Sequence, residues 1–506
     1  MRPSRVPGRV STRPATRHDF HESQFMSHHD ADNLHLLSTG IGGLDSVLGG
    51  GLPKDHLYLI QGLAGSGKTT LACQIGFHHA SHGKKVLVLT LIAESHAKLL
   101  QHLGNFGFFD PALVGSQVLF YGGYKALSEG GLRELLSFIS ACLSSHQPEI
   151  MIVDGFRSIR DSRPSDLALS EFMHSLNALV STMACTTFLL SPTEGNEAES
   201  ENTLVDGLIE LSQEEDGVRT IRELKVFKAR GANHLLGKHA FEICTGGLVV
   251  YPRLEAAATR SNHASDASDK QVRFGVPGLD EIVRHGFMQG SITNVIGTPG
   301  VGKTILGLHY IHQGLLDNET CLILGFFESP QRLLQKGRKV GIDLSDAMQD
   351  GRLEMIWHLP LEVLMDRLAS ELLENIDRRK VSRVLIDGVE GFHDVAMHPA
   401  RIKPFLIALV NELRRRNVTT LITQELPYFK SSYRDSDSSE SALYENILLL
   451  RSTVVSGADQ RLLSVMKVRE SGYDPAHRIM KISDHGIAIE NTVSAGAPFP
   501  EKQEGL

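Results

Sequence analysis

The stretch GLAGSGKTT, residues 62–70, decides the fold of this chain, and a second version, GTPGVGKTI, occupies residues 297–305. Both fit the pattern GxxxxGK[ST]. Each follows an apolar run and precedes a stretch with helical periodicity, which is the context in which this pattern binds phosphate. Glycines let backbone N–H groups turn toward an anion, and the N-terminus of the following helix adds positive potential. The sequence therefore predicts two P-loops that each bind a nucleoside triphosphate.

Particular side chains of these loops have predicted roles. Lys68 and Lys303 are expected to reach the terminal phosphates, while a threonine hydroxyl and a strand-end aspartate suit Mg²⁺. The predicted Mg²⁺ ligands are Thr69 and Asp154 in the first half, and Thr304 and Asp387 in the second. The predicted nucleotide-binding residues are Gly62, Gly65, Ser66, Gly67, Lys68, Thr69 and Thr70, then Gly297, Thr298, Pro299, Gly300, Val301, Gly302, Lys303, Thr304 and Ile305.

The two loops belong to a longer internal repeat. TGIGGLDSVLGGGLPKDHLYLIQG (39–62) parallels FGVPGLDEIVRHGFMQGSITNVIG (274–297), and EIMIVDG (149–155) parallels SRVLIDG (382–388). Ordered agreement at a nearly constant offset indicates a duplicated domain. The polar, Ala/Ser-rich segment between the copies is typical of a linker. We therefore expect a tail at 1–33, a first domain at 34–251, a linker at 252–272, a second domain at 273–490 and a tail at 491–506.

Apolar runs alternate with helical patterns within each half. In the first half the clear runs are LYLIQG, VLVLTL, QVLFY, EIMIVD and CTTFLLS. Runs that are apolar on both faces are typical of parallel strands covered by helices on either side. The predicted fold class is therefore α/β, with a mainly parallel sheet flanked by helices in each half.

Composition excludes several other classes of protein. The net charge of −8 and the pI of about 6.3 argue against a protein that holds nucleic acid by bulk positive charge. Five scattered cysteines without a CxxC pair indicate neither a disulfide framework nor a zinc site and favour a reducing cytoplasm. No run of 18 apolar residues exists, so we expect no membrane span. We interpret the arginine-rich residues 1–18 as a disordered tail upstream of a start at Met26.

Further charged residues suggest catalysis. Glu94 and Glu328 come just after the strand that follows each loop helix, where a carboxylate could polarise an attacking water. One KxR pair follows a late strand in each half, and alternation along a strand places both cations of a pair on one face. Such cations suit the γ-phosphate of a nucleotide in a neighbouring subunit. The two pairs are Lys228 with Arg230 and Lys467 with Arg469.

Together these motifs resemble the KaiC family of RecA-like ATPases, over residues 34–251 and 270–490. The specific marks are GIGGLDSVLGGGLPK, GLAGSGKT, IVDG and KARG with the following NH, then GVPGLDEIVRHGF, GTPGVGKT, FFESP, LIDG, KVR and ISDHGIAI. The resemblance implies two tandem RecA-like domains, a two-tier homohexamer with ATP between subunits, and a contact of His234 with nucleotide. It further implies that the first domain hydrolyses ATP, that the second can phosphorylate its own Ser/Thr residues, and that signalling proteins are partners.

Three departures from the family pattern bear on chemistry. The family's two adjacent glutamates are replaced by Ala93-Glu94 and Phe327-Glu328, so either the remaining glutamates compensate or the sites mainly bind ATP. Glu470 replaces the glycine of the second KxRG. The family's Ser-Thr acceptor pair corresponds to Ser441-Ala442. The candidate phosphoacceptors are Ser441, Ser439 and Ser438, with Ser436 a further substitute.

Three functional hypotheses follow. The first is an ATP-hydrolysing hexameric regulator with autokinase activity outside a circadian clock. The second is a DNA-handling RecA relative, which the acidic charge and the absence of a zinc module or helix-hairpin-helix motif disfavour. The third is an ATP-binding assembly scaffold with little turnover, which the missing acids favour.

Overall fold

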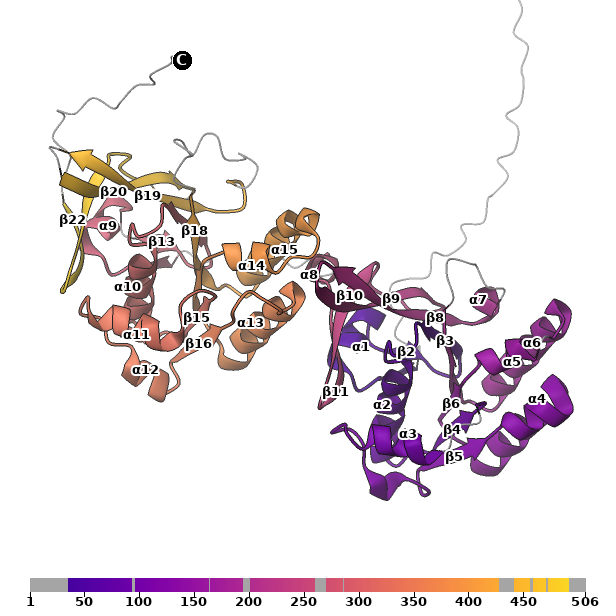
Figure 1. The fold of residues 1–506 in the computed structure, drawn as a ribbon. Coiled ribbons are helices and arrows are strands. Elements are labelled where there is room, and N and C mark those ends of the chain that lie inside the picture. The colour runs from indigo at the N-terminus through magenta and orange to yellow at the C-terminus, as the bar shows by residue number, and fades with distance from the viewer. Residues whose placement is uncertain are drawn as a thin grey trace, which may run out of the picture. The chain divides into compact units, whose positions relative to one another are not determined.

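The computed structural model describes residues 35–92, 96–162, 164–193, 201–259, 270–284, 286–426, 441–455, 458–469 and 472–490. Both predicted tails, residues 1–33 and 491–506, lie outside these ranges. Within them the chain forms two similar halves, each built around its own nine-stranded sheet (Figure 1).

The first half begins with a short strand pair and continues into alternating strands and helices. Its strands are β1 Leu36–Leu37, β2 Leu52–Pro53, β3 Leu57–Gly62, β4 Val86–Thr90, β5 Val118–Gly122, β6 Ile150–Asp154, β7 Thr186–Ser191, β8 Gly207–Asp216, β9 Arg219–Ala229, β10 Lys238–Cys244 and β11 Gly247–Tyr251. Its helices are α1 Gly42–Leu48, α2 Lys68–Ser81, α3 His96–Leu103, η2 Pro111–Leu113, α4 Tyr124–His146, α5 Arg157–Asp161, α6 Asp166–Thr182 and α7 Glu201–Leu204, followed by α8 Leu254–Ala258.

The second half repeats this order. Its strands are β12 Gln271–Val272, β13 Phe287–Met288, β14 Ile292–Gly297, β15 Cys321–Gly325, β16 Leu353–Trp357, β17 Arg383–Asp387, β18 Thr419–Glu425, β19 Asn446–Val455, β20 Ala458–Val468, β21 Arg478–Ser483 and β22 Gly486–Glu490. Its helices are α9 Pro277–Ile282, α10 Lys303–Leu316, α11 Pro330–Arg338, α12 Ser345–Gln349, α13 Met365–Arg379, α14 Glu390–Asp394, η3 Pro399–Arg401 and α15 Ile402–Arg415.

The two sheets share one topology. The first has the order β11-β10-β9-β8-β3-β7-β6-β4-β5, and the second has the corresponding order β22-β21-β20-β19-β14-β18-β17-β15-β16. Six strands of each sheet are parallel, and the last three in each half form an antiparallel meander at one edge. The P-loop strands β3 and β14 lie near the middle, so each loop leaves the carboxyl edge of its sheet with parallel strands on both sides.

Each sheet is covered on both faces, as its apolar strands require. In Figure 1, α2 and α3 lie on one side of the first sheet and α4 and α6 on the other, while α10 and α13 take the corresponding sides of the second. The strand residues divide accordingly, since alternate positions of β3 belong to two separate apolar clusters. This arrangement confirms the predicted α/β fold with two tandem RecA-like domains.

The segment predicted as a linker begins with a helix. α8 starts right after β11, and its Leu254 is packed among the buried residues of the second half. The backbone N–H of Leu254 donates to Asp366, and Glu255 pairs with Arg401. The run Glu-Ala-Ala-Ala has high helix propensity, which explains the helix. The domain boundaries themselves stay a prediction.

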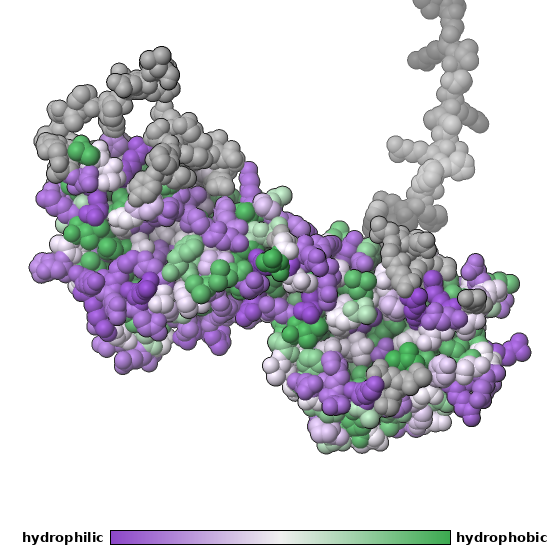
Figure 2. All heavy atoms as spheres, in the orientation of Figure 1, coloured by the Kyte–Doolittle hydropathy of each residue, from purple (hydrophilic) through white to green (hydrophobic). Residues whose placement is uncertain are grey.

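Hydrophilic and hydrophobic residues are mixed over the face drawn in Figure 2, where the hydrophobic ones form several separate groups. Among the described helices, none is both long enough and apolar enough to cross a membrane.

Two histidines, the buried His239 and the half-buried His309, indicate how stability depends on pH. The Nδ1 of His239 accepts the N–H of Arg253, and the Nε2 of His309 accepts the N–H of Ile487. Burial lowers the pKa of each to about 4. An unfolded histidine binds its proton near pH 6.5, so the unfolded state binds more protons below that pH and stability falls between about pH 6.5 and 4. We expect a loss of about 1–2 kcal/mol per histidine by pH 5, measured by urea denaturation at pH 7.5 and 5.0.

The control for this prediction is His309→Gln. The glutamine carbonyl can still accept the N–H of Ile487 but does not titrate, so the variant is expected to lose less stability on acidification. Equal unfolding midpoints for the unsubstituted chain at both pH values would contradict the assignment.

Candidate nucleotide-binding sites

Both P-loops turn into their helices through left-handed glycines. Gly67 has φ +102° and Gly302 has φ +110°, directly before α2 and α10. A Cβ added to Gly67 would lie 2.7 Å from the side chain of Ile243, and one added to Gly302 would lie 2.6 Å from that of Ile482. A side chain there would be strained and would clash with the meander, so these positions require glycine. Neither helix start has a capping side chain, which leaves its N–H groups directed at the loop's concave side, where an anion fits.

The lysine of each loop is held by the loop itself. Lys68 Nζ donates to the carbonyls of Gly62 and Leu63 at 2.8 and 2.9 Å, and Lys303 Nζ donates to those of Gly297 and Thr298 at 2.8 and 3.0 Å. Burial lowers the pKa of both ammonium groups, whereas nearby carboxylates raise it. A partly desolvated cation at the mouth of the loop is suited to a phosphate oxygen.

The predicted Mg²⁺ ligands come together in both halves. Thr69 Oγ1 donates to Asp154 at 3.0 Å, and Thr304 Oγ1 donates to Asp387 at 3.3 Å. Thr423 Oγ1, which sequence reasoning missed, also donates to Asp387, at 2.7 Å. Burial raises the pKa of Asp387 while these hydroxyls lower it. Hydroxyl and carboxylate oxygens are the donors that Mg²⁺ prefers, so the residues present fit this ion.

The second loop borders a cavity of about 750 Å³ that is large enough for a nucleotide. Its walls include the predicted residues Pro299, Gly300, Gly302, Lys303, Thr304, Ile305, Glu328 and Asp387, and also Phe327, Lys336, Gly388, Glu390, Thr423 and Glu425. The four acids among these residues come from the carboxyl ends of β15, β17 and β18 and the segments just after them, which meet at one edge of the parallel sheet.

Only some acids of this cavity were foreseen. Glu328 lines it as predicted, but its carboxylate forms an ion pair with Lys336 on α11. Glu390 and Glu425 were missed, although an acid right after a buried parallel strand is a recognisable signal. The backbone N–H of Glu425 donates to Glu390 Oε1 at 2.6 Å. In the first half, Glu94 lies outside the described residues.

The KxR pairs lie at the opposite edge of each sheet from the P-loop of the same half. Lys228 pairs in register with Leu208 and Lys467 with Ile447, three residues before the partners of Gly62 and Gly297. Three strand residues span about 10 Å. Lys228 donates to the carbonyls of Thr203 and Val205, and Arg230 pairs with Asp206 at 3.1 Å. These cations therefore do not reach the loop of their own half.

In the second half, the KxR pair meets the candidate acceptor segment. Lys467 Nζ donates to the carbonyls of Ser441 and Tyr444, both at 2.6 Å, and Arg469 donates to that of Ala442 at 3.2 Å. Ser441 is half-buried. Ser436, Ser438 and Ser439 lie outside the described residues, as does Glu470. His234, half-buried in the connection between β9 and β10, follows Arg230 at the same sheet edge.

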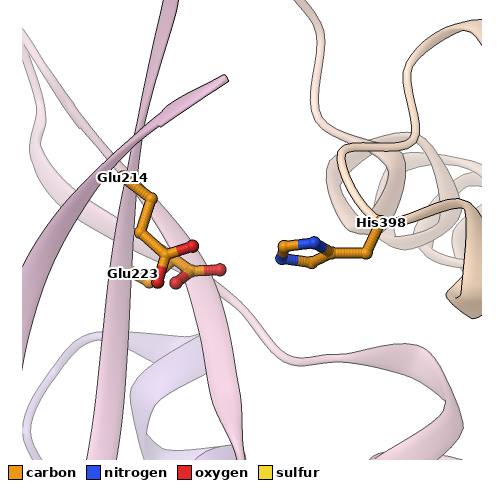
Figure 3. A group of neighbouring side chains, drawn as sticks. All are labelled: Glu214, Glu223 and His398. Atoms are coloured by element: carbon orange, nitrogen blue, oxygen red, sulfur yellow. The ribbon is translucent and has the colours of Figure 1, made fainter. Parts of the chain in front are cut away.

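A separate acidic cluster does not form a convincing metal site. Figure 3 shows Glu214 and Glu223 side by side on β8 and β9, with the ring of His398 facing them. Lys238 forms ion pairs with both glutamates, at 3.0 Å for Glu223. The Lys238 ammonium already stands between the two carboxylates, and we assign no metal to this group.

Comparisons with known proteins agree with this geometry. A family model described as "ATPase: KaiC" matches residues 37–255 and again residues 272–494. The circadian clock oscillator protein KaiC of Parasynechococcus marenigrum (strain WH8102) is 26% identical over 470 residues, which cover 90% of this chain and 91% of that protein. KaiC of Acaryochloris marina (strain MBIC 11017) is 25% identical over 465 residues, covering 90% and 88%.

Proposed function

Since this chain belongs to the KaiC family of ATPases, we propose that it binds ATP at both P-loops, hydrolyses it, and transfers a γ-phosphate to its own Ser441. The observation that carries this proposal is the constellation found in both halves. In each half, the P-loop lysine donates to loop carbonyls and the threonine after it donates to the strand-end aspartate. All three residues lie at the sheet's carboxyl edge. These are the groups that phosphoryl transfer requires.

The residues of this chain would divide the work as follows. Lys68 and Lys303 exchange their loop carbonyls for terminal phosphate oxygens, and the free N–H groups at the starts of α2 and α10 bind the phosphate chain. Thr69 with Asp154, and Thr304 with Asp387, would hold Mg²⁺, which neutralises phosphate charge when bound. The protein thus contributes mainly positioning and electrostatic stabilisation.

We further propose a homohexamer with ATP between subunits. The position of both KxR pairs at the amino edge supports this, since their cations can meet a nucleotide only in an adjoining copy. Phe327, Leu359 and Leu361 are more than half exposed near the second sheet's carboxyl edge, where a neighbouring subunit would cover them. Signalling proteins are the proposed further partners.

An assembly scaffold with little turnover is the second candidate. Ala93 and Phe327 in place of acids, and the pairing of Glu328 with Lys336, favour it. It predicts nucleotide-dependent oligomers without phosphate release. A DNA-handling ATPase would instead show ATP turnover stimulated by DNA. The net charge of −8 disfavours this function.

Incubation with γ-³²P-labelled ATP and Mg²⁺ tests the proposed autokinase. We expect the full chain to incorporate label, and Ser441→Ala to lose most of it, because Lys467 and Arg469 hold the backbone carbonyls of Ser441 and of the residue after it. Size measurement with and without ATP checks the hexamer in the same samples.

The matched control is Ser452→Ala, an exposed serine on β19 in the same half, which is expected to keep full labelling. Phosphate release without label would leave an ATPase that lacks kinase activity. Undiminished label in Ser441→Ala would place the acceptor elsewhere.

A further inference from the structure

The cavity beside the second P-loop contains more acidic side chains than metal binding requires. Glu328, Asp387, Glu390 and Glu425 all line it. Asp387 is occupied by the hydroxyls of Thr304 and Thr423, at the position of the predicted Mg²⁺ ligand. The three remaining carboxylates differ in what they contact, and these contacts indicate which of them is available for chemistry.

Glu328 is already engaged by a cation. Its Oε1 forms an ion pair with Lys336 on α11, and both side chains are about one-third exposed, at 31% and 35%. This ion pair directs the Glu328 carboxylate toward α11. The neighbouring position toward the strand is Phe327, whose ring cannot accept a proton. Neither residue of this pair is therefore well placed to activate a nucleophile.

Glu425 occupies a different position in the same cavity. It ends β18 and pairs in register with Gly297, the first residue of the P-loop, and the N–H of the next residue, Leu426, donates to Gly297 O at 3.0 Å. Burial is the largest influence on the pKa of Lys303 and lowers it. Among the carboxylates that raise this pKa, Glu425 has the largest effect. Glu425 thus lies on the side of the loop where the ammonium of Lys303 is expected to bind the terminal phosphate.

Glu390 fixes the strand end that carries Glu425. Glu390 is the first residue of α14, and its Oε1 accepts the backbone N–H of Glu425 at 2.6 Å. This contact leaves the side-chain carboxylate of Glu425 at the exposed mouth of the cavity, where it can return a proton to bulk water.

At the matching positions that the structure describes, the first half has other side chains. By strand register and loop contacts, Leu190 replaces Thr423, and Pro192 replaces Glu425. Arg157 stands three residues after Asp154, as Glu390 does after Asp387. The additional acids therefore belong to the second site and did not come with the duplicated loop.

We propose that Glu425, positioned by Glu390, is the catalytic base of the second site, where it compensates for the acid that is missing at position 327. The inference rests on the ATP hydrolysis proposed above. The Glu425 carboxylate takes one proton from water while the water oxygen bonds to the γ-phosphorus. The bond from that phosphorus to the β–γ bridging oxygen breaks, and ADP leaves with the electron pair. Glu425 then releases its proton to solvent, so the products are ADP, inorganic phosphate and a proton.

The test measures phosphate release and ATP-induced thermal stabilisation in the full chain, with Lys68→Ala as the parent so that only the second site turns over. Glu425→Gln is expected to lower phosphate release by about 10² or more and to keep ATP-induced stabilisation. Glu328→Gln is expected to change turnover less than about tenfold. Glu374→Gln, an exposed glutamate on α13, is the matched control.

A positioning role for Glu390 has its own signature. Glu390→Gln keeps an oxygen for the Glu425 N–H and should retain most turnover, whereas Glu390→Ala should lower kcat with little change in KM. If Glu390→Ala unfolds the chain, the Glu390→Gln and Glu425→Gln pair still decides the issue.

The possible outcomes distinguish a failure of this inference from a failure of the proposed ATP binding and hydrolysis. Normal turnover in Glu425→Gln overturns the inference, as does a collapse confined to Glu328→Gln. A Lys68→Ala parent that ATP stabilises but that releases no phosphate also overturns it, while leaving ATP binding intact. A parent and an unsubstituted chain that ATP does not stabilise would refute the proposed function itself.

Discussion

Replacing Lys303 by alanine is expected to lower the ATP affinity of the second site by about 10²-fold, or about 3 kcal/mol, and to leave the first site loaded. The ammonium group is desolvated and lies among the carboxylates of Glu425, Glu390 and Asp387, so its removal leaves a cavity lined by acids that repels a triphosphate. The measurement is the number of ATP molecules retained per chain after gel filtration. We expect the value to fall from two to one.

Lys339→Ala is the matched control, since Lys339 is exposed at the end of α11 in the same half. Lys68→Ala should produce the complementary loss at the first site. Two ATP molecules retained by Lys303→Ala would contradict the assignment of this residue to the triphosphate.

The parallel part of each sheet could be predicted from sequence because its signal is local. LYLIQG coincides with β3, and EIMIVD and CTTFLLS each begin one residue before β6 and β7. Strands buried on both faces are apolar at every position, and these two strands and β3 contain almost no exposed residue. The repeat then extends the result to the second half, whose sheet has the same topology.

The antiparallel meanders gave no comparable signal. β8 runs from apolar GLIEL into SQEED, and β9 mixes buried, half-buried and exposed positions without a regular period. Such strands lie at the sheet edge with one face toward water, so their composition overlaps with that of loops. The helix α8 was missed for another reason. It is five residues long, too short for a period, and its position depends on packing of Leu254 in the second half.

The candidate site was predictable where it is contiguous in sequence and not where it is assembled by the fold. The loop, Thr304 and Asp387 follow from one motif and one strand end. Thr423 and Glu425 come from β18, more than a hundred residues after the loop, and only the pairing of β18 with β14 places them beside it. Lys336 has no signal at all, because its role depends on how α11 is oriented toward Glu328.

The largest stability effect is expected for Arg383→Met. Arg383 is completely buried at the start of β17, the strand that ends at Asp387. Its guanidinium donates to Glu319 at 2.7 Å and to the carbonyls of Tyr310 and Arg273 at 2.9 and 3.0 Å. Removing it leaves Glu319 without its close partner and takes one donor from each of two carbonyls, so we expect a loss of about 3–5 kcal/mol in the free energy of unfolding, measured in urea.

Two further variants distinguish charge from packing as the cause. Arg338→Met removes an exposed ion pair with Asp343 in the same half and should cost less than about 1 kcal/mol. Adding Glu319→Gln to Arg383→Met should recover part of the loss, because the penalty comes mainly from the carboxylate left unpaired. The first half has Ile150 at the matching register position, so the strand itself accepts an apolar residue there. An Arg383→Met chain as stable as Arg338→Met would show that the buried guanidinium contributes little. In that case the placement of Asp387 would depend on the apolar packing of β17 alone.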